Sequence, residues 1–386
     1  MDVDAVVAEV TAAVGLAEGE AGVRDILAAV LSAEPAAVRE ISRLAELPVP
    51  IVAAACNELR KRDVVDNTRP VRLTAAGRAA LAAGQPDLHV GCPVCAGRGV
   101  VLPDTAAELA AEVELAAVGA PDAKPELDQT HCTVATKLNR VLRLHAAHAL
   151  AGQRILVLGD DDLISVAIAA FAAWSGHPAM VRRLAVIDAD ADVLAWIGKQ
   201  AARSGLTIDL IEHDLRAPVP GELVGGFDVV LTDPPYTVAG AQLFLSRAVA
   251  ALAPEPGRHI FFSFGARRPE ETAAVQLAIA QMGLAVRSLT PNFNEYIGAG
   301  VLGGTSHLYH LRSTAAARPL ITGVHEGALY TADGRTVALR PYRCAGCQSV
   351  HEVGPGGRWP RIADLQAAGC PDCGGAIFRP MALKPR

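Results

Sequence analysis

The chain has 386 residues, 51% of them apolar, and a formal net charge of −6. This length predicts two or three domains with sizeable cores, and the negative charge argues against a protein that binds nucleic acid over its whole surface. No uncharged apolar run is long enough to span a membrane, and the N-terminus has acids where a signal peptide has bases. We therefore expect a cytoplasmic protein with no membrane span.

Residues 1–88 are predicted to form a winged-helix domain. Helical periodicity and turn signals within residues 22–85 predict three helices, a two-stranded wing with its turn at Asp66-Asn67, and a closing helix. The domain carries 13 acidic and 9 basic residues. Because DNA affinity depends on cations, we rank DNA binding below a dimerising or substrate-covering role, and we expect a homodimer. The basic triplet Arg60-Lys61-Arg62 keeps a nucleic-acid partner as an alternative.

Residues 89–128 are predicted to hold a cysteine knuckle and a linker helix. Cys92 and Cys95 form a Cys-x-x-Cys pair, with glycines that permit a tight turn. One such pair supplies at most half of a tetrahedral zinc site. Cys56, His131 or Cys132 could complete the site, so metal binding at this knuckle stays an open alternative.

Residues 129–312 alternate buried strands with helices. Apolar strands are expected at 154–159, 183–190, 207–214, 227–232 and 259–265, followed by a final pair of strands at 285–290 and 306–313. Continuous apolar strands are typical of a parallel sheet covered on both faces. The order predicts an α/β fold, a class I methyltransferase-like doubly wound sheet that ends in an antiparallel strand.

Ligands bind beyond the carboxyl ends of the strands in such sheets. The first strand ends at Gly159, where the chain can turn close to a cofactor, and Asp160-Asp161-Asp162 follow. A loop that binds the carboxylate of S-adenosylmethionine is normally rich in glycine, because bare N–H groups must meet that carboxylate. The acid run therefore favours a cofactor that lacks the carboxylate, or a polycationic substrate. Capping of the next helix accounts for one of these acids at most.

Acidic residues also end the second and third predicted strands. Asp188 is expected to bind a ribose diol, with Asp190 as the alternative. Asp214, beside His213, is the candidate adenine contact.

Asp233-Pro234-Pro235-Tyr236 follows the fourth strand and is the strongest single signal in the chain. The prolines stiffen the turn and lack N–H groups, so the carbonyls before them can point at a substrate amine. Asp233 can accept a hydrogen bond from that amine and hold it near an electrophilic carbon. Tyr236 can offer its ring face to a cation.

The acid run and the proline turn together resemble the branched-chain polyamine synthase family, the N4-aminopropyltransferases that act on spermidine. The segments LDQTHCTVATKLNRV (127–141) and FNEYIGAGVLGGTSHLYHL (293–311) are similar to further motifs of that family. The resemblance covers roughly residues 20–312.

This resemblance implies that decarboxylated S-adenosylmethionine donates an aminopropyl group to a polyamine amine. It implies Asp161 or Asp162 as base and Asp233 with Tyr236 as positioners, while Glu295 could add one more carboxylate. The implied cofactor contacts are Gly159, Asp160, Asp188, Asp214, Gln129 and Pro234. The alternative is S-adenosylmethionine itself, as donor of a methyl or 3-amino-3-carboxypropyl group to a small molecule or a nucleic-acid base. Lys137, Arg140 or Arg143 would then have to meet the methionine carboxylate.

Residues 313–386 form a region that we do not expect in simpler members of this family. Two Cys-x-x-Cys pairs, Cys344 with Cys347 and Cys370 with Cys373, lie 22 residues apart. This spacing predicts a four-cysteine zinc ribbon. The stretch 312–386 has 10 basic and 5 acidic residues, which suggests a lid over an acidic site or contact with an anionic partner.

Overall fold

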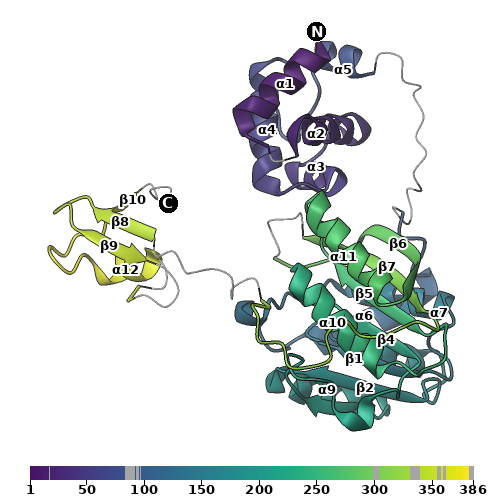
Figure 1. Ribbon diagram of the computed structural model, residues 1–386. Coiled ribbons are helices and arrows are strands. Elements are labelled where there is room, and N and C mark those ends of the chain that lie inside the picture. The colour runs from purple at the N-terminus through teal and green to yellow at the C-terminus, as the bar shows by residue number, and fades with distance from the viewer. Residues whose placement is uncertain are drawn as a thin grey trace. The chain divides into compact units, whose positions relative to one another are not determined.

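The computed structural model describes residues 1–16, 18–82, 92, 95, 97–298, 304–330, 340–353, 358–359 and 362–381. The chain forms two compact units, Met1–Gly327 and Ala328–Arg386 (Figure 1). The division falls after residue 327, where we had expected a boundary after residue 312. The segment in between belongs to the first unit, because the guanidinium of Arg247 donates to the backbone carbonyls of Ile321 and Gly323 at 2.9 and 2.7 Å. Among the described residues, no helix combines the length and the apolar character needed to cross a membrane.

The N-terminal region is helical. Its elements are α1 (Val3–Val14), α2 (Gly19–Ala33), α3 (Val38–Ala45), α4 (Val49–Lys61) and α5 (Ala75–Leu81). Helix α1 lies upstream of the predicted set, and its Val7 and Val10 are buried in the same core as Ile26 and Leu59. Where a two-stranded wing was expected, an isolated antiparallel bridge joins Val65 with Leu73, and a second bridge joins Val71 with Ala36, which lies before α3.

A seven-stranded mixed sheet forms the centre of the first unit. Its strands are β1 (Arg154–Leu158), β2 (Arg183–Asp188), β3 (Asp209–Glu212), β4 (Val229–Thr232), β5 (His259–Phe264), β6 (Leu284–Glu295) and β7 (Thr305–Ser313). Their order is β3-β2-β1-β4-β5-β7-β6. The first five strands run parallel, and β7 pairs antiparallel with both β5 and β6. The predicted methyltransferase-like doubly wound sheet is confirmed.

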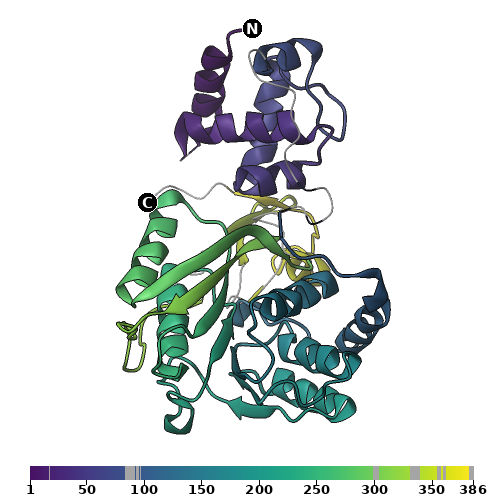
Figure 2. The same cartoon turned by 90° about the vertical axis from the view of Figure 1, so that its right-hand side faces the viewer.

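Helices cover both faces of this sheet (Figure 2). They are α6 (Ala107–Ala117), α7 (Val134–Ala146), α8 (Ile164–Trp174), α9 (Ala191–Ser204), α10 (Val238–Ala251) and α11 (Pro269–Gln281). Short 3-10 helices occur at Asp104–Ala106, Pro125–Leu127 and Gly221–Leu223. Helix α8 packs against α6, α7 and α9, which explains why nearly all of its residues are apolar and buried. Helices α10 and α11 pack together on the other face of the sheet (Figure 2).

The second unit is a small antiparallel sheet with one helix. Its elements are β8 (Arg340–Cys344), β9 (Val350–Val353), α12 (Ile362–Ala368) and β10 (Phe378–Pro380), with strand order β10-β8-β9. Two cysteines, Cys344 and Cys370, belong to its small core together with Leu365 and Phe378. The predicted C-terminal unit that carries the four cysteines is confirmed.

Candidate active site and four-cysteine cluster

The carboxyl ends of β1 and β4 lie side by side and define the candidate active site. Leu158 pairs with Thr232 in the parallel register, so the residues that follow each strand leave the sheet next to each other. Gly159 has a φ of +74°, a left-handed conformation that favours glycine and turns the chain away from β1. The acid run and Asp233 are thereby brought together.

Asp160 is used by the start of α8. Its carboxylate accepts hydrogen bonds from the backbone N–H of Ile164 at 2.6 Å and of Ser165 at 3.1 Å, and from the Ser165 hydroxyl. The side chain is buried, and burial raises the pKa of Asp160 to about 7. Both carboxylate oxygens of Asp160 thus accept hydrogen bonds from the start of α8, where backbone N–H groups lack partners within the helix. Asp160 is therefore the one residue of the acid run that caps the next helix.

Asp162 is bound to a buried cation. One of its oxygens accepts from the backbone N–H of Cys132 at 2.5 Å, and the other from Arg140 Nη1 at 2.9 Å. Burial opposes ionisation of this carboxyl, but the charges of Arg140 and Lys137 prevail and lower its pKa. A carboxylate held ionised by an arginine is a weak proton acceptor, so Asp162 fits a base poorly.

Asp161 differs from both of its neighbours. Its Oδ2 accepts a hydrogen bond from the backbone N–H of Thr130 at 3.0 Å. Burial, and then the negative charges of Asp162, Asp233 and Asp188, raise the pKa of Asp161 well above its ordinary value. A carboxylate whose protonated form is favoured in this way is suited to accept a proton from a substrate.

Arg140, on α7, connects the two strand ends. Its side chain is buried; its Nη1 donates to Asp162, its Nη2 to Asp233 at 2.7 Å and to the Tyr296 hydroxyl at 3.1 Å, and its Nε to Asn294 at 2.7 Å. The sequence named Arg140 only as a cation that could meet a methionine carboxylate. The structure instead places it between two carboxylates of the protein.

Two tyrosine hydroxyls hold Asp233. Tyr296 donates to its Oδ2 at 2.6 Å and Tyr236 to its Oδ1 at 2.9 Å, and the two hydroxyls are 2.7 Å apart. Burial raises the pKa of Asp233 against the opposing charge of Arg140. The Tyr236 ring lies on the backbone of Gly265, where an added Cβ would come within 2.6 Å of the ring. Pro234, in the same turn, is buried. Tyr296 was missed as a site residue, although it lies in the quoted 293–311 motif.

The second strand end carries a network of its own. Asp188 is buried and accepts from the backbone N–H groups of Asp160 and Asp190, both at 2.8 Å. Gln129 donates to Asp190 at 3.1 Å, so Gln129 and Asp188 lie at the same edge of the site. Asp214 stays outside this group: it is exposed and pairs loosely with Arg216 at 3.7 Å.

The other two cations considered for a methionine carboxylate are also engaged by protein groups. Lys137 Nζ donates to the Asp162 carbonyl. Arg143 donates to the Arg98 carbonyl and lies over the Phe293 ring, 5.6 Å from its centroid.

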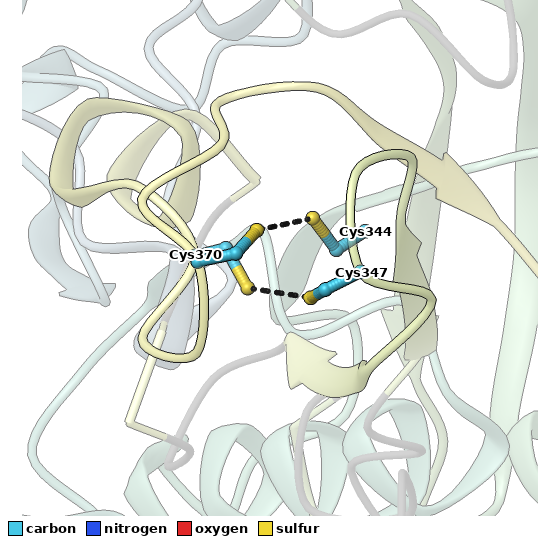
Figure 3. A group of neighbouring side chains, drawn as sticks. Cys344, Cys347 and Cys370 are labelled. Carbon is cyan, nitrogen blue, oxygen red and sulfur yellow. Dashed lines mark hydrogen bonds between the residues drawn. The ribbon is translucent and has the colours of Figure 1, made fainter.

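The four C-terminal cysteines form a compact cluster (Figure 3). Two sulfur pairs, Cys344 with Cys373 and Cys347 with Cys370, are each separated by 3.5 Å. Four zinc–sulfur bonds of about 2.3 Å at tetrahedral angles put sulfurs roughly 3.8 Å apart, so the donor set fits zinc. A Cβ at Gly346 would lie 3.3 Å from the Cys373 sulfur, which explains a glycine in that turn.

Cys92 and Cys95 belong to no such cluster of metal-ligating side chains within the part of the chain that the structure describes. Of the suggested partners, Cys56 lies in the N-terminal core, and Cys132 is buried beside Asp162. The ring nitrogens of His131 lie 2.8 and 2.9 Å from the carbonyl oxygens of Asp161 and Pro121. The structure therefore gives no support to a metal site completed by these three residues.

Comparisons with known proteins agree on one family. The model of the branched-chain polyamine synthase A C-terminal domain matches residues 108–313. The N(4)-bis(aminopropyl)spermidine synthase of Thermococcus kodakarensis is 31% identical over 270 residues, which cover 68% of this chain and 74% of that protein. An uncharacterised protein of Methanocaldococcus jannaschii is 32% identical over 371 residues, which cover 94% of this chain and 89% of that one. The crystal structure of the Thermus thermophilus branched-chain polyamine synthase, with N4-aminopropylspermidine and 5'-methylthioadenosine, has a TM-score of 0.67 and 25% identity. The match covers 86% of this chain and 99% of that one.

Proposed function

From the premise that this chain belongs to the branched-chain polyamine synthase family, we propose that it transfers the aminopropyl group of decarboxylated S-adenosylmethionine to a secondary amine of a spermidine-like polyamine. The Thermus relative was crystallised with an aminopropylated spermidine and with 5'-methylthioadenosine. These are the two molecules that such a transfer produces.

The charges at the strand ends carry this proposal. Lys137, Arg140 and Arg143 each donate to protein oxygens, and Arg140 is paired with the carboxylates of both Asp162 and Asp233. Buried acids surround the same point. The negative potential of these acids suits an aminopropyl donor that lacks a carboxylate and an aminopropyl acceptor that carries several ammonium groups.

We propose that Asp161 is the base that removes the proton from the attacking amine. The secondary ammonium of the polyamine loses its proton to the Asp161 carboxylate, and the freed nitrogen bonds to the carbon of the aminopropyl group that is attached to the sulfonium sulfur. The carbon–sulfur bond breaks, and its electron pair stays on sulfur, which leaves as 5'-methylthioadenosine. Asp233, fixed by Tyr236, Tyr296 and Arg140, accepts a hydrogen bond from the amine and aligns it for attack.

We assign the nucleoside to the β1–β2 edge of the site. Gly159 gives the backbone room to approach it, and Asp188 with Gln129 lines the ribose side. Pro234 borders the amine side. Asp160 acts indirectly, because it fixes the start of α8 and contacts Asp188 through its own N–H. Asp214 is retained only as a candidate adenine contact at the rim.

One observation favours a second candidate donor, S-adenosylmethionine with its carboxylate. Arg267 follows β5, is half-buried, and has a pKa that burial lowers; its electrostatic neighbours are Glu271, Tyr236 and Asp128. Because its charge interacts with Tyr236, this guanidinium is the candidate partner for the carboxylate of the donor. Methyl or 3-amino-3-carboxypropyl transfer would then be the reaction.

Calorimetry separates the two donors. Decarboxylated S-adenosylmethionine should bind the wild-type chain at least tenfold more tightly than S-adenosylmethionine, and mass spectrometry should find aminopropylated spermidine after incubation with it. Arg267→Gln should leave this preference unchanged. Tighter binding of S-adenosylmethionine that is lost in Arg267→Gln would reject the aminopropyl proposal.

We also propose that the four-cysteine cluster binds a structural zinc ion. Its sulfurs fit a tetrahedral site, and the small core around Cys344 and Cys370 contains few apolar residues. Small units with so little core commonly depend on a metal.

The N-terminal region supports a role other than DNA binding. Each of its three predicted DNA-contacting cations has a local partner: Arg60 donates to Asn57, Lys61 to Glu58, and Arg62 to Glu9 and Glu58. A homodimer remains a prediction, which sedimentation would test.

A further inference from the structure

Glu295, at the end of β6, connects three separate segments of the first unit. Its Oε1 accepts from Arg43 Nη1 of α3 at 3.1 Å and from Arg98 Nη2 at 2.9 Å. Two arginines thus compensate this carboxylate. The sequence suggested this residue as an additional carboxylate for a polyamine, and both arginines contact the same oxygen of it.

The backbone of Glu295 is fixed just as firmly. Its N–H donates to the Thr136 hydroxyl at 2.9 Å, and its carbonyl accepts from the N–H of Thr133 at 2.9 Å. Both threonines lie at the start of α7, the helix that carries Arg140. The next residue is Tyr296, whose hydroxyl is 2.6 Å from Asp233. A shift at Glu295 therefore moves the side chain that holds Asp233.

The contact with α3 extends beyond this ion pair. Asn292 donates to the Arg43 carbonyl at 2.8 Å, and its Oδ1 accepts from Thr305 of β7 at 2.8 Å. Glu46, the residue directly after α3, has its Oε1 3.7 Å from His307 Nε2. The end of α3 is thus joined to both strands of the β6–β7 pair.

We propose that Glu295 is a positioning residue through which the N-terminal helical region sets the Tyr296–Asp233 contact of the transferase site. The N-terminal region is then a working part of the enzyme. The argument for an effect on rate rests on the proposed function. The half-exposed ion pairs of Glu295 add little to overall stability, whereas small displacements of a positioning group reduce catalysis by about 100-fold.

A double-mutant cycle tests whether Glu295 acts through Tyr296. Glu295→Gln should lower kcat about tenfold or more and leave the KM for the donor within about twofold. Tyr296→Phe should lower kcat at least as far. The double variant should then have the kcat of Tyr296→Phe alone. If the two losses instead multiply in the double variant, Glu295 does not act through Tyr296 and the proposal is wrong.

Hydrogen exchange provides a second measurement that does not depend on activity. Arg43→Met should speed exchange of the amides of residues 295–297, two of which donate to Gly304 and His131 carbonyls. Arg24→Met is the matched control, because Arg24 pairs with Asp4 at 2.8 Å within the N-terminal region. If the amides of residues 295–297 exchange at the same rate in both variants, the N-terminal region is not coupled to Glu295 and the proposal is wrong. A wild-type chain that makes no product would reject the proposed function, and the exchange result would still decide the coupling.

Discussion

The acidic site of the first unit and the cysteine cluster of the second differ in how their residues come together. The cysteines lie in two Cys-x-x-Cys turns, and each turn brings two ligands into position by itself. The acidic site draws Arg140 from α7, Asp233 from the end of β4 and Tyr296 from the end of β6. One site depends on short-range geometry, and the other on the whole sheet.

This difference decides what a motif can predict. In the cysteine cluster all four residues have the same role, so their spacing defines the site. In the acid run, three adjacent carboxylates meet three environments: Asp160 caps a helix, Asp162 pairs with Arg140, and Asp161 keeps a raised pKa. Residue type alone did not distinguish them.

The largest expected effect comes from removing one cysteine of the four-cysteine cluster. Cys370→Ser should remove zinc, about one ion per chain in the wild type, and unfold the second unit, because structural zinc sites contribute on the order of 10 kcal/mol to folding. Metal content is measured by emission spectrometry and folding by hydrogen exchange of residues 340–353. The first unit should keep its unfolding temperature, since it is compact by itself.

Cys92→Ser is the matched control for this loss. It should leave the zinc content unchanged. A fall in zinc of the same size would show that the knuckle at Cys92 and Cys95 binds metal, and wild-type zinc in Cys370→Ser would contradict the four-cysteine site.

The next largest effect distinguishes Asp161 from its neighbour Asp162 in the acid run. Asp161→Asn should lower kcat by about 10²–10⁴-fold, the usual contribution of a general base, with little change in unfolding temperature. Because the pKa of Asp161 is raised, wild-type kcat/KM should increase as pH rises through that pKa, and the variant should lose this increase. Asp209→Asn is the control, since Asp209 is half-exposed and pairs with Arg183.

Asp162→Asn should behave in the opposite way. Removing one partner of its buried ion pair with Arg140 should cost about 3–5 kcal/mol of stability. If Asp161→Asn unfolds the chain while Asp162→Asn leaves a stable and inactive protein, the two assignments must be exchanged.

The sequence predicted the sheet but only part of its site. Residues 154–313 alternate apolar strands with helices along the chain, and this alternation predicted the doubly wound fold that the structure shows. The pairing of Arg140 with Asp162 and Asp233 depends on how α7 packs against α8 and β6, over separations of 22 and 93 residues. Arg140 and Tyr296 both lie within the family motifs quoted, and for Tyr296 this was the only sequence signal.

The N-terminal region shows the same limit. Its helices α2 to α5 were predicted from the sequence pattern, but the partners of its cations were not. Arg62 reaches Glu9 of α1, a helix that was not predicted. The contact of Arg43 with Glu295 spans 252 residues and has no local signature.

A smaller effect concerns the acid that caps α8. Asp160 has a pKa of about 7 in the folded chain and an ordinary value of 3.8, so its ionisation costs at most about 4 kcal/mol of stability. This stability is complete below pH 4 and is lost as pH rises towards 7. Asp160→Asn, which can still cap the helix, should therefore gain stability relative to wild type between pH 4 and 8. A constant difference in unfolding temperature across this range would show that Asp160 stays ionised.

The smallest effect tests whether the cysteine cluster is as local as its spacing suggests. His351 Nε2 lies 3.2 Å from the Cys370 sulfur and 2.9 Å from the Ser349 hydroxyl. Groups that hydrogen-bond metal ligands typically change metal affinity by about 10–100-fold. His351→Phe should weaken zinc binding by this factor in a competition with a chelator, whereas Glu352→Gln, exposed on the same strand, should not. Unchanged affinity in His351→Phe would mean that the four sulfurs alone determine the site, and the contrast with the acidic site would then be complete.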